Sequence, residues 1–444
     1  MKSRTPSLLK TLRTLGAIAA IVIATTASSH ATNINSNGTG GGSWNSGSTW
    51  SGGVVPPNAD LWSVLSTDSV TAGSGVNFNN TSAYACTVLG TLTINSGANF
   101  NLYRLNSGLS SGHGTINVNG GTLTTAGLLG STGYTGTINI SNGGFVSQTS
   151  TAIAGVYTFN INSGGVFSNQ SGFFSGATVN LNSGGVLETP VGAASLPQVN
   201  ATFNWNGGTF VLNTNSSYAI NNSVLNGLMT AFQNNASNVL QLSNQSSKQT
   251  VTLGTGTSSG NISPTKGILA FNVYSPTAND NDLITESNTT GANAAITLPS
   301  AVHLQINNAT LTGDFSSYIG ASYKLFNTSS TYSTINPTID PTYWTLNGVE
   351  YRVGWNNTLN SNGSVAVSSL VPPVGYGRGE HYSFGEDSNG FSIIPAGPTV
   401  SGPRSRIEKN GSTTRSCASR RSRAASRRNS LRGASRTGRS PTRM

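Results

Sequence analysis

The chain has few charged residues and almost no cysteine. Only 8% of its 444 residues are Asp, Glu, Lys or Arg, and its two cysteines are Cys86 and Cys417. Two cysteines cannot build a disulfide framework, and their spacing matches no metal-binding motif. Cys86 lies in the strand-like run 84–88 and is predicted to be a small buried hydrophobic side chain rather than a reactive thiol. Rigidity is therefore expected to come from packed strands.

Charged side chains are nearly absent from the middle of the chain. Glu188 is the only acid between Asp68 and Asp280, and no Lys or Arg occurs between Arg104 and Lys248. A glycosidase generally needs two carboxylates across the scissile bond. A calcium-dependent polysaccharide lyase needs clustered acids and a base. The middle of the chain supplies neither set, which disfavours an enzyme.

The net charge of +10 comes from the two ends of the chain. Residues 401–444 hold 13 Lys or Arg and one acid, and residues 1–31 hold four basic residues and no acid. The remaining body has 6 basic and 12 acidic residues and is mildly acidic. Because no basic groove runs through it, no nucleic-acid partner is expected for the folded body.

One phrase of alternating apolar and polar residues is repeated six times. Its copies begin at Thr91, Thr115, Thr137, Thr158, Thr178 and Thr202, at nearly constant intervals. Intervals of this size are typical of a stacked repeat. In the copy TVNLN, Val179 and Leu181 alternate with polar residues, which predicts a strand with one buried face. A Gly-Gly pair ends five of the copies and indicates a sharp turn with positive φ.

These features predict an all-β fold, a right-handed parallel β-helix with one coil per repeat. Stacked coils cover one another's apolar faces and place equivalent residues about 4.8 Å apart. Hairpins in a sandwich are the competing interpretation, because residues 182–185 also suit a hairpin turn. A period of about 22 residues favours the solenoid. The repeated asparagines are expected to hydrogen-bond in a ladder: Asn117, Asn139, Asn160, Asn180 and Asn204.

The chain divides into six segments. They are a signal peptide (1–31), an N-terminal cap with the first strands (32–90), the β-helix repeats (91–212), an irregular or short helical insertion (213–249), a C-terminal β segment (250–370) and a disordered basic tail (371–444). The first segment places basic residues before an apolar stretch and a small-residue cleavage site, so export is expected. The C-terminal β segment suits either a terminal β domain or irregular last coils. No apolar stretch of the mature chain reaches the length of about 20 residues that a membrane span needs.

Several stretches resemble one bacterial protein family. Residues 44–60 and 84–97 look like the opening of autotransporter-associated β-strand proteins, and residues 267–273, 281–284 and 320–326 resemble their closing segment. The similarity covers about residues 40–370. It implies an exported surface or extracellular β-helix of a Gram-negative bacterium.

Many proteins of that family end in a sorting signal of the PEP-CTERM kind, with Val-Pro-Glu-Pro, a membrane helix and a basic cluster. Leu370-Val-Pro-Pro373 resembles the start of this signal, but the glutamate and the membrane helix are absent. The Arg/Ser-rich tail is either a natural basic arm for anionic polysaccharide or out-of-frame translation of a GC-rich gene end. A Val-Pro-Glu-Pro motif with an apolar helix in a shifted reading frame would identify the second case.

Three classes of function follow from the sequence. The first is a non-catalytic exported surface or extracellular-matrix protein. The second is a carbohydrate-binding or adhesive module whose partners are extracellular polysaccharide or cell-surface components, and the third is a polysaccharide lyase or glycosidase. No cofactor is expected. The candidate glycan contacts are Trp44, Trp50, Asn160 and Asn180, although a cap that covers the end of the core is the favoured interpretation of the two tryptophans.

Two further polar sites have a structural and a functional interpretation. His113 is expected to be an exposed turn residue rather than a catalytic base, because no acid or nucleophile motif accompanies it. Asp280 and Asp282 offer carboxylates for calcium, but the stretch lacks the glycine and distal glutamate of an EF-hand loop. A turn-forming role is favoured for both aspartates, and no metal is expected.

Overall fold

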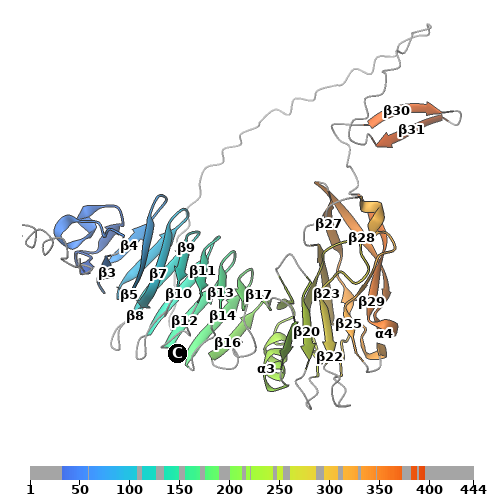
Figure 1. The fold of residues 1–444 in the computed structure, drawn as a ribbon, viewed down its shortest axis with the longest axis horizontal. Helices are drawn as coiled ribbons and strands as arrows, with labels where there is room; N and C mark the ends of the chain where they lie inside the picture. The colour runs from blue at the N-terminus through green and yellow to red at the C-terminus, as the bar shows by residue number, and fades with distance from the viewer. Residues whose placement is uncertain are drawn as a thin grey trace, which may run out of the picture. The chain divides into compact units, whose positions relative to one another are not determined.

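A computed structural model describes most of the chain between residues 33 and 395. The described residues are 33–58, 60–107, 113–126, 135–149, 156–170, 176–189, 201–212, 217–220, 222–243, 248–253, 261–286, 295–308, 314–328, 332–346, 348–372, 382–387 and 390–395. The predicted signal peptide and most of the predicted basic tail lie outside them. The chain forms two compact units, Met1–Tyr376 and Gly377–Met444. Nearly all regular structure in the described residues is β-strand (Figure 1).

Sheet 1 is the longest sheet of the first unit, and its 13 described strands are all parallel. In spatial order they are β1 (Asn33–Asn35), β3 (Leu61–Val64), β5 (Asn77–Val88), β7 (Asn99–Ser107), β9 (Thr122–Thr125), β11 (Phe145–Gln148), β13 (Val166–Asn169), β15 (Val186–Glu188), β17 (Thr209–Val211), β19 (Val239–Gln241), β21 (Gly267–Val273), β23 (Val302–Asn308) and β26 (Thr338–Ile339).

Sheet 2 takes the alternate strands of the first half and is also parallel throughout. Its strands are β2 (Gly41–Ser43), β4 (Ser69–Ala72), β6 (Thr91–Asn95), β8 (His113–Asn119), β10 (Thr135–Ser141), β12 (Val156–Ile161), β14 (Ala177–Asn182) and β16 (Ala201–Asn206). Each coil therefore gives one strand to each sheet, which is the architecture of a parallel β-helix. The parallel pairing confirms the predicted solenoid and excludes stacked hairpins.

The six copies of the phrase stack in register. Thr91 pairs with Thr115, and the later copies follow with the same partner positions up to Thr202. Ile161 lies directly beside Leu181, and both side chains are completely buried. In the repeat strands β6 to β14 of sheet 2 the alternation of the sequence thus places every second residue in the core and leaves the others on the outer face.

The Gly-Gly pair serves two different purposes in the turn that joins the sheets. In residues 182–185 the Gly185 N–H donates to the Asn182 carbonyl at 2.9 Å. Gly184 has φ of 73°, a conformation that favours glycine. A Cβ on Gly185 would instead approach the carbonyl oxygen of Ile161, in the preceding coil, to 2.3 Å. The first glycine allows the bend and the second allows close stacking of coils.

The coils continue beyond residue 212, where the sequence pattern indicated that they stop. Sheet 1 runs on through β19, β21, β23 and β26, while sheet 2 ends at β16. A new parallel sheet, sheet 3, begins on the other side with β18 (Ser217–Ile220), β20 (Thr250–Leu253), β22 (Leu283–Glu286) and β25 (Phe326–Asn327). The predicted insertion 213–249 therefore contains solenoid strands, and much of the segment 250–370 forms further coils. These later strands lack the repeated phrase, and their register is set by pairing with strands that are distant in the sequence.

Helix α3 (Asn222–Phe232) lies where sheet 2 gives way to sheet 3, within the segment 213–249 for which a short helix was one of the two expectations. Phe232, at its C-terminal end, is fully buried and packs on Trp205 of β16 with ring centroids 5.5 Å apart. Gly267 carries no side chain, and a Cβ there would lie 2.4 Å from the Phe232 ring. The helix therefore packs against the last strand of sheet 2 through buried aromatic rings.

Sheet 4 is antiparallel and follows the last coils. It contains β24 (Ser322–Lys324), β29 (Ser364–Val371), β28 (Val349–Thr358) and β27 (Thr342–Leu346), with the short helix α4 (Leu359–Asn362) between β28 and β29. The pairing of β28 with β29 has a register shift between Gly354 and Trp355. The sequence analysis left two interpretations of residues 250–370 open. The parallel strands of this segment form last coils, and its antiparallel sheet corresponds to a terminal β domain.

The second unit contains one described hairpin in the tail that was predicted to be disordered. Strands β30 (Tyr382–Asp387) and β31 (Gly390–Pro395) pair antiparallel, with Asp387 opposite Gly390. The two strands are joined by a two-residue connection, the commonest length in β-hairpins. The other residues of the predicted tail lie outside the described residues, apart from Val371 and Pro372.

Asp68 attaches the loop after β1 to the second coil. Its carboxylate accepts hydrogen bonds from the Gly38 and Gly40 N–H groups, each at 2.8 Å. Burial by itself raises the pKa of Asp68, but hydrogen bonds from Ser36 and from these two amides outweigh burial and hold the pKa below its ordinary value of 3.8. The ionised carboxylate therefore stabilises the N-terminal cap.

Replacing Asp68 by Asn is expected to lower the free energy of unfolding at pH 7 by about 1–3 kcal/mol, because two amides lose a charged acceptor. The folded pKa is depressed, so the contribution of Asp68 is complete above its ordinary pKa and is lost as the pH falls through the folded pKa. Urea unfolding at several pH values should show the two proteins converge in acid. A difference that stays constant into strong acid would contradict this assignment.

Candidate functional site

The outer surface of sheet 2 is a regular array of uncharged polar side chains, here named the Thr–Asn face. Its strands alternate between buried residues and outward residues that are mostly half-exposed. The outward residues form three rows: Thr91, Thr115, Thr137, Thr158, Thr178 and Thr202; Thr93, Asn117, Asn139, Asn160, Asn180 and Asn204; Asn95, Asn119, Ser141, Asn162, Asn182 and Asn206. Neighbouring strands of a sheet lie about 4.8 Å apart, which sets the spacing along each row.

The middle row forms the predicted asparagine ladder. The Nδ2 group of each asparagine donates to the Oδ1 atom of the asparagine one coil earlier. The distances are 2.8 Å for Asn139 to Asn117, 2.8 Å for Asn160 to Asn139, 2.7 Å for Asn180 to Asn160 and 2.7 Å for Asn204 to Asn180. At the first coil Asn117 donates to the Thr93 hydroxyl at 3.5 Å. All amides therefore point the same way along the stack.

A second ladder, which the sequence analysis did not identify, follows the third row. Asn182 donates to Asn162 at 2.9 Å and Asn206 donates to Asn182 at 3.1 Å. Where Ser141 interrupts the row, the turn residue Asn142 takes its place and donates to Asn119 at 2.7 Å. The sequence did indicate this second ladder, because an Asn or Ser recurs one or two residues before each glycine pair.

Replacing Asn160 by Ala is expected to lower the free energy of unfolding by about 1–2 kcal/mol, the usual net loss for two amide hydrogen bonds. Both of these ladder bonds are half-buried. Asn101→Ala is the matched control, because Asn101 makes one exposed bond to Asn79 in sheet 1. The midpoints of urea unfolding measure the loss of stability in both variants. Equal effects of the two changes would show that the ladder adds nothing beyond a single surface bond.

The threonine row differs from the two amide rows. Within the described part of the chain, no hydrogen bond engages the side-chain hydroxyl of Thr115, Thr137, Thr158 or Thr178. A hydroxyl both donates and accepts. The row thus offers uncommitted groups to water or to a ligand beside amides that hold their own orientation.

Trp44 and Trp50 lie in the N-terminal cap and do not serve as sugar platforms. Each is only 2% exposed. The ring of Trp44 makes edge contacts with Trp50, Trp62, Phe78 and Phe100, at centroid distances of 4.9, 5.2, 5.6 and 4.8 Å. The Trp50 Nε1–H donates to the Trp44 carbonyl at 2.8 Å. The proposed glycan contact at these two residues is therefore wrong, because an aromatic cluster closes the end of the core. Asn160 and Asn180 do lie on the accessible Thr–Asn face.

The remaining candidate groups hold structural positions. His113, exposed at the start of β8, contacts the Thr135 hydroxyl through Nδ1 at 3.0 Å. Asp282 is buried and accepts from the Gln249 and Asn272 N–H groups at 3.0 and 2.9 Å and from the Tyr274 hydroxyl at 2.8 Å. Burial outweighs these bonds and raises the pKa of Asp282 to about 6. Burial also raises the pKa of Cys86 to about 12, which makes its thiol inert at neutral pH.

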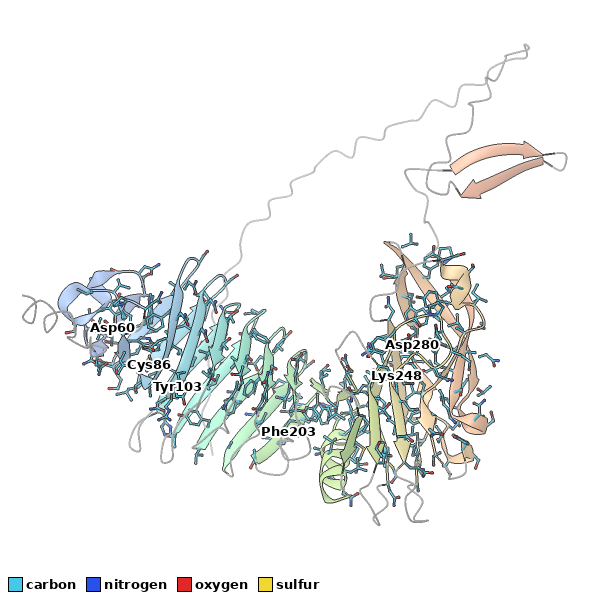
Figure 2. All side chains as sticks on the ribbon, in the orientation of Figure 1. Asp60, Cys86, Tyr103, Phe203, Lys248 and Asp280 are labelled. Carbon is cyan, nitrogen blue, oxygen red and sulfur yellow. The ribbon has the colours of Figure 1, made fainter. Side chains whose placement is uncertain are left out.

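Before Asp280, the carboxylates of the described coils are few and far apart. Asp60 precedes β3 and Glu188 ends β15, six strand steps further along sheet 1. At about 4.8 Å a step, this separation is about 29 Å. Figure 2 shows Asp60 on the first coils and Asp280 among the later ones. A glycosidase pair is separated by only about 5–10 Å. In the described residues, no group of three or more Asp, Glu, His or Cys side chains is arranged to hold a metal ion.

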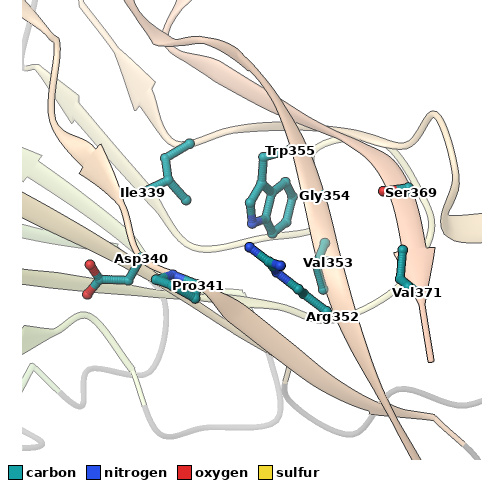
Figure 3. Close-up of a pocket in the computed structure, with 9 residues that line it drawn as sticks. All are labelled: Ile339, Asp340, Pro341, Arg352, Val353, Gly354, Trp355, Ser369 and Val371. Atoms are coloured by element: carbon teal, nitrogen blue, oxygen red, sulfur yellow. The ribbon is translucent and has the colours of Figure 1, made fainter. Parts of the chain in front are cut away.

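A cavity of about 400 Å³ lies at the start of β27, and the sequence analysis missed it (Figure 3). Its polar and aromatic lining comes from Asp340, Arg352, Trp355 and Ser369. These residues belong to three separate segments that only the antiparallel sheet brings together. The sequence pointed to this cavity only through the proximity of Arg352 and Trp355 in one strand.

Comparisons with known proteins do not assign the chain. No protein-family model matches it, and no curated protein shows significant sequence similarity to it. No helix in the described part of the chain is both long and apolar enough to cross a membrane.

Proposed function

We propose that the protein is a non-catalytic, exported surface or extracellular-matrix β-solenoid of a Gram-negative bacterium. The observation that carries this proposal is the in-register stacking of the repeat coils, in which the middle row of side chains joins each coil to the next and the third row adds amide bonds between some of them. Such a structure extends by nearest-neighbour contacts and is suited to a rigid scaffold. The scarcity of carboxylates on the repeat coils and the resemblance to autotransporter-associated β-strand proteins support the same function. Anchoring through a PEP-CTERM-like signal is not part of the proposal.

Export is tested by expressing the full chain in a Gram-negative host and fractionating the cells. We expect the protein outside the cytoplasm, with a new N-terminus at Thr32 found by mass spectrometry. Retention in the cytoplasm with residues 1–31 intact would contradict the proposal. Incubation with neutral and acidic polysaccharides should yield no shortened products. Degradation that disappears in a folded Glu188→Gln protein would establish an enzyme instead.

Carbohydrate binding by the Thr–Asn face is the second candidate function. The uncommitted hydroxyls of the threonine row favour it, because they stand at a fixed spacing beside amides, and both groups hydrogen-bond neutral glycans. The uncharged character of the face favours a neutral polymer over an acidic one.

The double variant Thr158→Val and Thr178→Val is expected to weaken binding to insoluble neutral polysaccharide at least fivefold. It removes two hydroxyls but keeps the β-branched shape that suits a strand. Thr252→Val, a half-exposed position of β20 in sheet 3, is the matched control and should bind as the wild type does. Pull-down isotherms measure the affinities. Unchanged binding by the double variant would exclude the face as the glycan site.

A further inference from the structure

The cavity at the start of β27 has the size and lining of a small-ligand site. It measures about 400 Å³, within the range of roughly 300–1,000 Å³ found for such sites. One wall is the segment between β26 and β27, which includes Asp340 and Pro341. The opposite wall is formed by β28 and β29 of sheet 4. Apolar and polar groups both line it, a combination that lets a pocket hold and orient one ligand.

The indole of Trp355 is held firmly at this cavity. Its Nε1–H donates to the Thr342 hydroxyl at 3.1 Å. Its ring meets Trp344 edge to face, with centroids 5.4 Å apart and planes at 80°. Trp344 is fully buried, so the contact fixes the orientation of the half-buried Trp355 ring. With its N–H engaged, the indole presents an apolar ring surface to a ligand, which suits the C–H face of a sugar ring.

Arg352 brings an unpaired positive charge to the same cavity. The exposed guanidinium forms no ion pair with any described residue. Asp340, the one acid among the lining residues, is engaged by His303, whose Nδ1 lies 2.5 Å from its Oδ1 atom. Figure 3 shows the Arg352 side chain extending toward the indole of Trp355 while the Asp340 carboxylate points away. The planar guanidinium is therefore available for a two-point contact with a carboxylate.

A β-bulge shapes the wall that carries Ser369. Gly354 pairs with Ser369 and Trp355 with Val367, so Ser368 is an extra residue in β29. A Cβ on Gly354 would lie 2.3 Å from the Ser369 hydroxyl oxygen. Glycine at this position thus leaves room for the Ser369 hydroxyl at the cavity, where it can bond a ligand hydroxyl. Bulges frequently redirect side chains beside functional sites.

We propose that this cavity binds one hexuronate unit of an acidic polysaccharide. The carboxylate pairs with the Arg352 guanidinium, the sugar ring lies against the Trp355 indole, and the Ser369 hydroxyl bonds a ring hydroxyl. A carboxylated sugar fits better than a phosphate or sulfate, because a single planar cation matches the planar carboxylate and no second cation is among the described residues that line the cavity. The site is separate from the uncharged Thr–Asn face and does not depend on it.

The test follows the Trp355 indole N–H resonance of the full-length protein during titration. Sodium D-glucuronate, D-glucose and sodium acetate are the three probes, and a Trp355→Phe protein assigns the resonance. We expect saturable shifts with glucuronate and at least tenfold weaker binding of glucose and acetate, because glucose lacks the carboxylate and acetate lacks the sugar ring and its hydroxyls. Arg352→Gln should weaken glucuronate binding at least tenfold, whereas Lys324→Gln, which removes a cation outside the cavity, should leave it unchanged.

Circular dichroism should show wild-type melting for both variants, since Arg352 is exposed. The proposal is overturned if glucuronate causes no saturable shift, if glucose or acetate binds as tightly as glucuronate, or if Arg352→Gln binds as the wild type does. Tight binding of inorganic phosphate with weak binding of glucuronate would also overturn it, in favour of an anion site. None of these outcomes bears on the Thr–Asn face, whose variants are tested separately.

Discussion

Replacing Leu181 by Asp is expected to lower the free energy of unfolding by at least about 3 kcal/mol, the scale of burying an unpaired polar group. Leu181 is fully buried between Ile161 of the preceding coil and Trp205 of the next. Aspartate at this position places a carboxylate without a partner in an apolar core, where it either ionises at high cost or takes up a proton. Each coil stabilises its two neighbours, so the damage should spread through the central repeats.

The control for this change is the adjacent residue on the other face. Asn180→Ser removes two ladder bonds from a half-buried site. At the usual net value of such bonds, the loss should be no more than about 1–2 kcal/mol. Thermal unfolding by circular dichroism and hydrogen exchange of the central coils measure both variants. If the protein tolerates Leu181→Asp as well as Asn180→Ser, the assignment of buried and exposed faces in sheet 2 is wrong.

The second large effect is expected at the N-terminal cap. Trp44→Ala should lower the free energy of unfolding by about 3–5 kcal/mol, the usual range for removing a buried aromatic side chain. It leaves a cavity among four aromatic rings and removes the favourable edge-to-face contacts with them. Because the cluster covers the open end of the core, hydrogen exchange should rise first in β3 to β7.

Tyr343→Ala is the matched control for the loss of an aromatic ring. Tyr343 is 55% exposed on β27. Its removal should therefore change stability by no more than about 0.5 kcal/mol, as is usual for a surface substitution. Glycan pull-downs with Trp44→Ala add a second readout. Reduced glycan binding by a variant with wild-type stability would show that Trp44 acts as a ligand contact, contrary to its buried position.

The local pattern of the sequence predicted the repeat coils well. The alternation in the phrase at Thr178 determines which side chains are buried, and the nearly constant interval between copies determines their partners. The asparagine ladder follows directly, since residues at the same place in successive coils must lie side by side. The glycine pair predicted the bend at Gly184, but the role of Gly185 required the backbone of the coil beneath it.

Features without a period in the sequence could not be predicted in this way. The coils after residue 212 do not carry the phrase, and their register depends on pairing between segments that are distant in the sequence, such as β21 with β23. The sequence favoured a cap over a sugar site for Trp44, but only its four aromatic neighbours decide between the two. The sequence pattern indicated disorder across the tail, where β30 and β31 form a hairpin.

The sequence by itself favoured the solenoid over hairpins and determined the polar outer face of the repeat strands and the first asparagine ladder, because each coil contacts neighbours at a nearly fixed interval. Only the parallel pairing of the strands excluded hairpins. Tertiary structure alone decided the closure of the core by Trp44, the continuation of sheet 1 beyond α3 and the cavity at Arg352 and Trp355. These depend on residues from distant segments whose approach no interval encodes. Strand pairing and side-chain packing between these segments bring the residues together.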